Sequence, residues 1–270
     1  MRSSRWIDLA GAANVRDLGG LPTDDGQRIG PKRLIRADNL QGLTEADVRV
    51  LLDKYEVRAV ADLRTGIEVD AEGPGPMSRE PSVDVVHLSL FPEAGRNTDA
   101  GSLDDDDDTA VVLPWQNRGT DLGEPDRVRL GAAGVYLRYL DERPDSVLGA
   151  LRLIAAADGA TIVHCAAGKD RTGTVIALAL AEVGVTREAI VEDYAQSAER
   201  IEAIFARLNA SSTYRADLAN QSIDKHRPRA ATMEQFLDAV QAKHGGAADW
   251  LRAHGWTEDD AATLRKHLLS

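Results

Sequence analysis

Hydrophobic residues alternate between short β-branched runs and helical repeats over the first two-thirds of the chain. The runs at 57–63 (VRAVADL), 83–90 (VDVVHLSL) and 160–164 (ATIVH) have the length and composition of buried strands. Short strands around turns are also expected within residues 14–38, where glycine and aspartate clusters interrupt the pattern. Strands that alternate with helices predict an α/β fold whose central, mostly parallel sheet is flanked by helices.

Helical spacing of hydrophobic residues predicts the elements between and after these strands. Thr44, three residues before Asp47, resembles a capping box and indicates the start of one helix. The other helical patterns cover residues 127–142, 145–157, 172–183, 186–208, 231–244, 247–254 and 258–268. No strand pattern follows residue 164, so the C-terminal part is expected to be entirely helical.

Two polar segments interrupt this organisation. Residues 91–126 are rich in Gly, Asp and Pro and contain the run Asp104–Asp108, which predicts an acidic, flexible insertion. A calcium loop is set aside there, because the alternating ligand spacing and glycine turn of an EF-hand are missing. Residues 209–230 contain few core candidates and are either a lid over the site or a plain pair of surface helices. No Pro-rich or Ser-rich linker divides the chain, so residues 1–270 are expected to form a single domain.

Composition narrows the classes of partner. The 270 residues include 44 acidic and 32 basic side chains, which gives a net charge of −12. Such an acidic chain is a poor candidate for binding nucleic acid or an anionic membrane surface through charge. No run of about 18 apolar residues predicts a membrane span, and the first 18 residues lack the apolar stretch of a secretory signal. The cytoplasm is the default expectation, although leaderless secretion would leave no trace in the sequence.

The candidate chemistry centres on Cys165, the single cysteine. One cysteine excludes an internal disulfide and a Cys-based zinc cluster, and no metal site is expected. Residues 165–171, here called the cysteine loop, join the strand 160–164 to the helix 172–183. A five-residue gap between Cys165 and Arg171 allows the loop to curl so that its N–H groups and the guanidinium surround one tetrahedral anion. The positive end of the helix dipole favours the thiolate form of the cysteine there.

These residue types predict a phosphate site with its own nucleophile. Cys165 would attack phosphorus, and Arg171 would make two parallel bonds to phosphate oxygens. The hydroxyl of Thr172 is expected to donate a hydrogen bond to the sulfur, and the ring of His164 to orient the loop from behind. The residues expected to bind substrate are Ala166, Ala167, Gly168, Lys169 and Thr172. Lys169 either contacts a second phosphate, as on an inositol ring, or only raises the local potential.

The string HCAAGKDRTG at 164–173 resembles the signature loop of the cysteine-dependent phosphatases, in particular the bacterial atypical tyrosine phosphatases. Further segments match that family's pattern: NVRDLGG at 14–20, RAD at 36–38, VADLR at 60–64 followed by Glu68, and WLR at 250–252. The resemblance implies a phosphomonoesterase that works through a cysteinyl-phosphate intermediate without metal or organic cofactor. It implies phosphorylated partners: proteins carrying phosphotyrosine, phosphoserine or phosphothreonine, or phosphoinositides.

The general acid has three candidates, because no Trp-Pro-Asp sequence is present. Asp170 lies inside the cysteine loop, as in some inositide phosphatases, and is the first choice. Glu93 follows Phe91-Pro92 at a position where the family has been considered to place an acid, but its side chain is one methylene longer than aspartate. Asp62 ends a predicted parallel strand, where active sites gather, and could instead form a structural ion pair.

Other interpretations of the loop are weaker. A nucleotide-binding loop fails, because Asp170 stands where Ser or Thr is needed and Val163 where the first glycine belongs. An arsenate reductase would need further cysteines, and a sulfurtransferase as a rule lacks the Asp170–Arg171 pair. A dedicated inositol-phosphate or phosphoinositide phosphatase remains an alternative within the same chemistry. An inactive phosphate-binding module would predict a damaged loop, whereas this one is intact.

Overall fold

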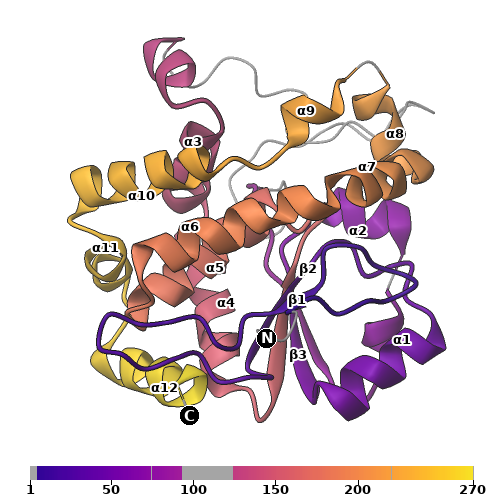
Figure 1. Cartoon of the computed structure of the whole chain (residues 1–270), viewed down its shortest axis with the longest axis horizontal. Coiled ribbons are helices and arrows are strands. Elements are labelled where there is room, and N and C mark those ends of the chain that lie inside the picture. Colours follow the sequence, from indigo (N-terminus) through magenta and orange to yellow (C-terminus); the bar gives the residue numbers. More distant parts are fainter. Residues whose placement is uncertain (1–4, 74, 93–123, 220, 270) are drawn as a thin grey trace.

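The computed structural model of the chain describes residues 5–73, 75–92, 124–219 and 221–269. A five-stranded sheet in the order β1-β2-β5-β3-β4 occupies its centre (Figure 1). The strands are β1 (Arg16–Asp17), β2 (Leu34–Ala37), β3 (Val57–Asp62), β4 (Asp84–His87) and β5 (Ala160–His164). Among these strands β1 pairs antiparallel with β2, and the other pairings are parallel. The predicted mostly parallel sheet is therefore confirmed.

Helices cover both faces of the sheet. The helices before β5 are α1 (Glu45–Arg49), η1 (Val50–Lys54), α2 (Gly66–Glu72), η2 (Pro76–Arg79), α3 (Glu124–Glu142) and α4 (Pro144–Ala156). The helices after β5 are α5 (Asp170–Glu182), α6 (Arg187–Gln196), η3 (Ser197–Arg200), α7 (Ile201–Ala210), α8 (Ser212–Leu218), α9 (Ile223–His226), α10 (Ala230–His244), α11 (Ala247–Ala253) and α12 (Glu258–Leu268). The described part of the chain after β5 contains no named strand, which confirms the all-helical C-terminal part.

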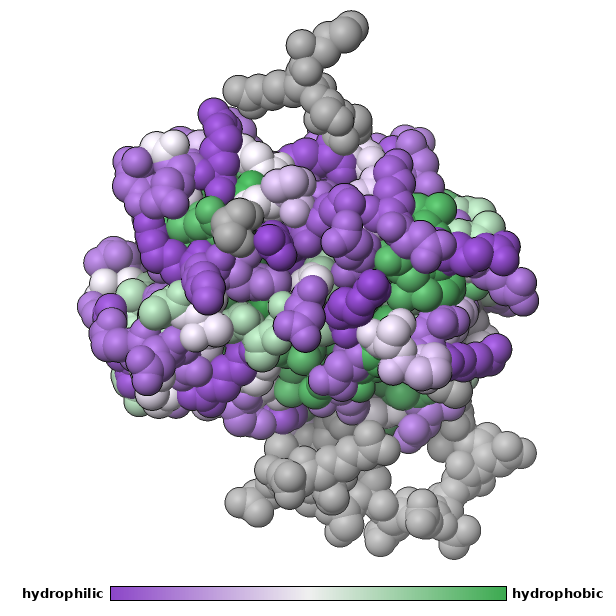
Figure 2. Space-filling view, turned by 90° about the horizontal axis from the view of Figure 1, so that it is seen from below, coloured by the Kyte–Doolittle hydropathy of each residue, from purple (hydrophilic) through white to green (hydrophobic). Residues whose placement is uncertain are grey.

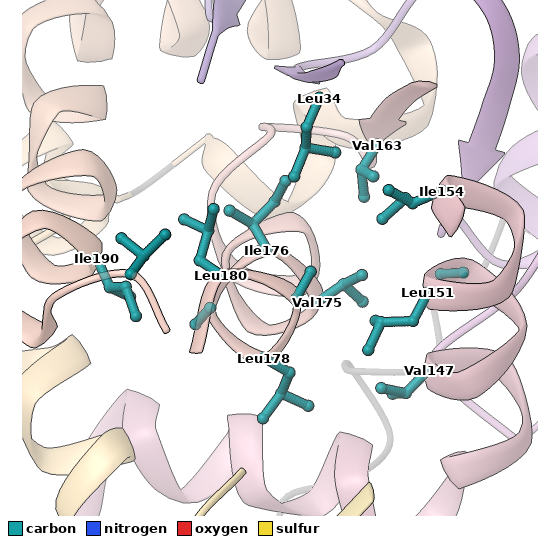
Figure 3. Close-up of a cluster of buried hydrophobic side chains, with 14 of the residues drawn as sticks. Leu34, Val147, Leu151, Ile154, Val163, Val175, Ile176, Leu178, Leu180 and Ile190 are labelled. Atoms are coloured by element: carbon teal, nitrogen blue, oxygen red, sulfur yellow. The ribbon is translucent and has the colours of Figure 1, made fainter. Parts of the chain in front are cut away.

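Alternation along the strands divides the core into two layers. Leu34 and Val163 face the larger cluster, which includes side chains of α4, α5 and α6 (Figure 3). Their neighbours Ile35 and Ile162 face the smaller cluster, which α1 and η1 cover. Because successive strand residues point to opposite faces, both faces of the sheet are buried, and the central strands are rich in apolar residues.

Three local features differ from the sequence patterns. The stretch predicted as one helix at 186–208 is broken by the 3-10 turn η3, where the buried Ser197 hydroxyl accepts a hydrogen bond from Arg16 (3.1 Å). Helix α2 has no counterpart among the predicted helices and is fixed by a capping box between Thr65 and Glu68. Residues 22–30, within the segment expected to hold short strands around turns, form a turn with two isolated bridges, Pro22 to Arg28 and Thr23 to Val185.

The two polar segments have different outcomes. Residues 93–123, most of the predicted acidic insertion, lie outside the described residues. Residues 209–230 include α8 and α9, and Tyr214 and Leu218 of α8 are buried. The face of the molecule shown in Figure 2 is largely hydrophilic, with hydrophobic residues in scattered patches. Among the described residues, no helix combines the length and the apolar character needed to cross a bilayer.

Candidate active site

The cysteine loop lies between the central strand β5 and the N-terminus of α5, at the carboxyl end of the parallel strands. Active sites of open α/β sheets gather at this edge. Cys165 is a free thiol with 2% of its surface exposed, and it borders the core beneath α5. The predicted strand–loop–helix setting of the cysteine is therefore present.

Side chains from the N-terminal strands hold the loop's carbonyl groups. The Asn14 amide donates to the carbonyl oxygens of Ala167 and Gly168, each at 3.0 Å. Arg36 donates to the Gly168 oxygen at 2.7 Å. Within the described part of the chain, the N–H groups of residues 166–169 donate to no protein acceptor. The loop's carbonyls are thus engaged with protein donors, and its N–H groups are left for a ligand.

Gly168 permits this loop geometry for two reasons. Its φ of +64° lies in the left-handed region that side chains rarely adopt. A Cβ atom built on it would stand 2.3 Å from the carbonyl oxygen of Ala37 at the end of β2. The loop and β2 can therefore approach this closely only with glycine at position 168.

A buried charge cluster supports Asn14 and Arg36. The Asp193 carboxylate of α6 pairs with Arg5 (2.9 Å), Arg16 (3.0 Å) and Arg36 (2.6 Å). Burial alone would raise the pKa of Asp193, but the nearby arginines outweigh it and lower the pKa. Arg16 also donates to the Asn14 side-chain oxygen at 2.7 Å, which aims the amide at the loop. One ionised carboxylate thus anchors the side chains that hold the loop.

Arg171, the predicted phosphate ligand, is fixed by Glu68 of α2. Its two terminal nitrogens reach the two oxygens of Glu68 at 2.6 and 2.9 Å. Tyr214 and the Thr65 N–H donate to the same carboxylate, at 2.9 and 2.7 Å. Burial disfavours both charges, yet mutual attraction raises the pKa of Arg171 and lowers that of Glu68. Both groups are therefore ionised at neutral pH, and the guanidinium is held beside Cys165.

Asp170 occupies the first position of α5, and its side chain is 36% exposed. The Tyr136 hydroxyl of α3 donates to its Oδ1. Its Oδ2 lies 3.4 Å from the Lys169 ammonium, which donates to the His226 carbonyl oxygen at 2.7 Å. Asp170 is thus a partly exposed carboxyl group at the edge of the cavity.

A cavity of about 560 Å³ opens above the loop. Cys165, Ala166, Ala167, Lys169, Asp170 and Arg171 line it. Apolar side chains of α3, α7 and α8 contribute much of the wall, among them Phe205, Leu208 and Leu218. The structure therefore brings together six of the predicted site residues.

The remaining predicted residues lie elsewhere or act differently. Gly168 packs against β2, as described above, instead of lining the cavity. Thr172 is fully buried, and among the described residues its hydroxyl has no hydrogen-bond partner, so the expected bond to the sulfur is not formed. Asp62 is buried in an ion pair with Arg64 (2.6 Å). Burial opposes the Asp62 charge, but nearby positive charge lowers the pKa of Asp62. Asp62 therefore fits the alternative of a structural ion pair and not the role of general acid.

Two further candidates belong to the surroundings of the loop. The His164 ring is buried behind it, with Nε2 3.5 Å from the Asp62 carboxylate, which agrees with a role in support. Burial lowers the pKa of His164 to about 4 despite that carboxylate, so the ring is neutral at pH 7. Glu93, the other candidate acid, lies outside the described residues.

Sequence reasoning missed several residues that shape the site. Asn14, Arg36 and Glu68 stood in matched motifs without an assigned role, and only their contacts reveal it. Asp193 and Tyr136 carried no local signal, because they meet the loop through long-range packing of α6 and α3. Within the described ranges, no three His, Cys, Asp or Glu side chains are grouped to hold a metal ion.

Comparison with known proteins identifies the class that this geometry defines. The sequence matches the tyrosine phosphatase family over residues 7–270. It is 33% identical over 223 residues to the triple specificity protein phosphatase PtpB of Mycobacterium tuberculosis, covering 78% of this chain and 75% of that protein. It is 32% identical over 244 residues to a tyrosine-protein phosphatase of Nostoc commune, covering 87% and 73%. The chain belongs to the tyrosine phosphatase family, which confirms the predicted class of enzyme.

Proposed function

We propose that the protein hydrolyses phosphomonoesters through a cysteinyl-phosphate intermediate, with Cys165 as nucleophile, Arg171 as phosphate ligand and Asp170 as general acid. The observation that carries the proposal is the loop itself. Its carbonyls are hydrogen-bonded to Asn14 and Arg36, the N–H groups of residues 166–169 donate to no acceptor in the described part of the chain, and Cys165 and Arg171 line the same cavity. Such a site stabilises the charge that develops on the transferring phosphoryl group.

The reaction proceeds in two displacements. The Cys165 sulfur forms a bond to phosphorus while the ester P–O bond breaks, and its electron pair stays with the leaving oxygen, which takes the Asp170 proton. The ionised Asp170 then takes a proton from water as the water oxygen attacks phosphorus, and the S–P electron pair returns to sulfur.

The cavity wall favours a flat, apolar substrate group next to the phosphate. Phe205, Leu208 and Leu218 line the cavity above the loop, and burial of an aromatic ring against such side chains contributes a large apolar area. We therefore propose phosphotyrosine as the preferred phosphomonoester, with phosphoserine and phosphothreonine as poorer substrates. The name of the M. tuberculosis relative, a triple specificity phosphatase, supports a broad range.

Inositol phospholipids, which carry a phosphodiester in addition to the phosphomonoester, fit this cavity less well. The lining cations Lys169, Arg171 and Arg138 are engaged with the His226 oxygen, Glu68 and Glu142, respectively. Three carboxylates, those of Asp170, Glu142 and Asp217, also line the cavity. A second phosphate would meet paired cations and like charge. We propose that phosphatidylinositol 3-phosphate is hydrolysed slowly, which argues against a dedicated phosphoinositide phosphatase.

Steady-state kinetics on a phosphotyrosine peptide, a phosphothreonine peptide and phosphatidylinositol 3-phosphate test this function. Wild type, Cys165→Ser and Asp170→Asn are compared on each substrate. Cys165→Ser should be inactive, and Asp170→Asn should lose roughly 10²–10⁴-fold in kcat, the usual contribution of a general acid. An active Cys165→Ser variant would refute the mechanism. Phosphate binding without hydrolysis by wild type would favour an inactive binding module.

We further propose that residues 209–230 act as a lid. In addition to Leu218 of α8, His226 of α9 lines the cavity. Tyr214 donates to Glu68 below, and the Lys169 ammonium donates to the His226 carbonyl oxygen. The segment is thus attached at two points next to the cysteine loop, Glu68 and Lys169. There it shields the Cys165 thiol, which has no second cysteine as a disulfide partner.

Peroxide inactivation tests the lid. Deleting 209–230 removes it, while Tyr214→Phe only breaks its bond to Glu68. Both variants should lose activity to hydrogen peroxide faster than wild type, and the deletion should be the faster of the two. Arg215→Ala, on the exposed side of α8, is the matched control and should behave as wild type. Unchanged inactivation of the deletion variant would contradict the proposal.

A further inference from the structure

Two tyrosines from different helices stand in line behind the Asp170 carboxylate. Tyr136 of α3 donates its hydroxyl hydrogen to Asp170 Oδ1, and the Tyr194 hydroxyl of α6 lies 2.7 Å from the Tyr136 hydroxyl. The single proton of Tyr136 goes to Asp170, so Tyr194 is the donor in the second bond. The chain of hydrogen bonds therefore runs from Tyr194 through Tyr136 to the carboxylate.

Both phenols keep their protons under all ordinary conditions. Tyr136 is 1% exposed and Tyr194 is 2% exposed. Burial, and then the nearby charge of Asp170, raises the pKa of Tyr136 well above its usual value and also raises that of Tyr194. The pair can therefore only donate toward Asp170 and cannot itself supply a proton to the reaction.

Packing fixes the position of the two rings. The Tyr136 ring stacks on Tyr139 at 6.2 Å and meets the ring of Phe236 edge-on at 5.9 Å. The Tyr194 ring lies against Gly173 of α5, where a Cβ atom would come within 2.9 Å of it. Gly173 is three residues after Asp170, on the next turn of the same helix. The rings are thus built into the fold, whereas Asp170 alone would be a partly exposed side chain with rotamer freedom.

We propose that Tyr136, supported by Tyr194, positions Asp170 for proton transfer by holding Oδ1. The proton is then carried to the leaving oxygen on Oδ2, which lies 3.4 Å from the Lys169 ammonium, itself bonded to the His226 carbonyl oxygen. Oδ1 accepts the Tyr136 hydrogen bond whether Asp170 is protonated or ionised, so the carboxyl group keeps one orientation through both displacements. Tyr136 is a positioning residue, because it acts on the substrate only through Asp170. The inference rests on the proposed role of Asp170 as general acid.

The test uses two aryl phosphates that differ in their need for an acid. The p-nitrophenolate of p-nitrophenyl phosphate leaves without help, whereas the phenolate of phenyl phosphate needs the proton. Tyr136→Phe keeps the ring and removes the donated bond. Its kcat/KM on phenyl phosphate, which reports the first displacement alone, should fall about tenfold, the equivalent of one charge-assisted hydrogen bond, and its kcat/KM on p-nitrophenyl phosphate by less than about threefold. Tyr194→Phe should show the same pattern with a smaller loss.

A double-variant cycle separates positioning from general structural damage. In the Asp170→Asn background, Tyr136→Phe should have no further effect on either substrate. Equal losses of kcat/KM on the two substrates, or a loss of kcat/KM that persists in that background, would overturn the proposal. If Asp170→Asn itself lost equally on both substrates, the acid assignment would fail and this inference with it. An active Cys165→Ser variant would instead refute the proposed function at an earlier point.

Discussion

Glu68 and Arg171 are 103 residues apart in the sequence and form a two-pronged ion pair. The two terminal guanidinium nitrogens of Arg171 each donate a hydrogen bond to one carboxylate oxygen of Glu68. Their side chains are 0% and 7% exposed. The carboxylate therefore sets the direction of the guanidinium from helix α2. Under the proposed function, a phosphate in the cysteine loop would meet an arginine whose orientation is already fixed, which would lower the entropic cost of binding.

Glu68→Gln should destabilise the fold and weaken catalysis together. The substitution keeps the size of the side chain but leaves the Arg171 cation buried without its counter-charge, which costs about 3–5 kcal/mol in comparable buried pairs. Urea unfolding should show that loss, and kcat/KM should fall at least about tenfold. Asp238→Asn, which breaks an exposed pair with Arg187, is the control and should change stability by less than about 1 kcal/mol. A Glu68→Gln variant with wild-type unfolding and activity would contradict this account.

Gly168→Ala should lower the free energy of unfolding by more than the positive φ at this position alone would cost. The new methyl group would meet the Ala37 carbonyl oxygen at 2.3 Å. Gly26 has a φ of +83° with no atom within 4 Å, so Gly26→Ala measures the cost of φ by itself, about 1–2 kcal/mol. Gly168→Ala should add about 1–3 kcal/mol for the clash and lose most activity. Equal unfolding midpoints for the two variants would contradict the clash, because they would show that β2 moves to accommodate the methyl group at little cost.

Asn14→Asp should weaken phosphate binding. The aspartate keeps the oxygen that accepts from Arg16 but loses both donors to the loop carbonyls. With about 1 kcal/mol for each lost bond, the inhibition constant of inorganic phosphate should rise roughly 10- to 30-fold. Asn39→Asp is a comparison on the adjacent segment, because Asn39 contacts the loop through its backbone N–H only. An unchanged inhibition constant in Asn14→Asp would mean that the loop keeps its shape without this residue.

His164 should make stability fall in mildly acidic solution. Burial holds its folded pKa at about 4, below the 6.5 of an exposed ring, so the unfolded chain takes up a proton first as the pH falls. Stability is therefore complete above about pH 6.5 and declines until about pH 4, by about 2 kcal/mol between pH 7 and pH 5. His164→Asn should reduce that decline in chemical unfolding, whatever its stability at pH 7. If His164→Asn lost the same stability between pH 7 and pH 5, the decline would come from titratable groups other than His164.

Local patterns were sufficient where a single segment determines the structure. The strand 160–164, the cysteine loop and the helix after it could be predicted because hydrophobic spacing, turn residues and the loop motif lie within one continuous stretch. The break after Gln196 could not be predicted. It depends on the bond from Arg16, almost two hundred residues earlier, to the Ser197 hydroxyl.

The candidate site divides in the same way. The residues proposed to bind the phosphate belong to the loop and could be predicted from its motif. The residues that hold the loop do not share its segment: Glu68, Tyr136 and Asp193 reach it from three separate helices. Their roles follow from tertiary packing, which no spacing within the sequence reports. The Thr172 hydroxyl shows the opposite error, because a residue well placed in the motif makes no bond to the sulfur among the described residues.

The charge cluster around Asp193 has a consequence for synthesis of the chain. Arg5, Arg16 and Arg36 are translated early, yet their shared carboxylate comes 28 residues after Cys165. A nascent chain that has exposed its cysteine therefore still lacks the anchor that holds Arg36 against the loop. Under the proposed mechanism, the cysteine loop gains this anchor only once residue 193 has been synthesised, so shorter nascent chains would carry Cys165 without the support that its role as nucleophile requires.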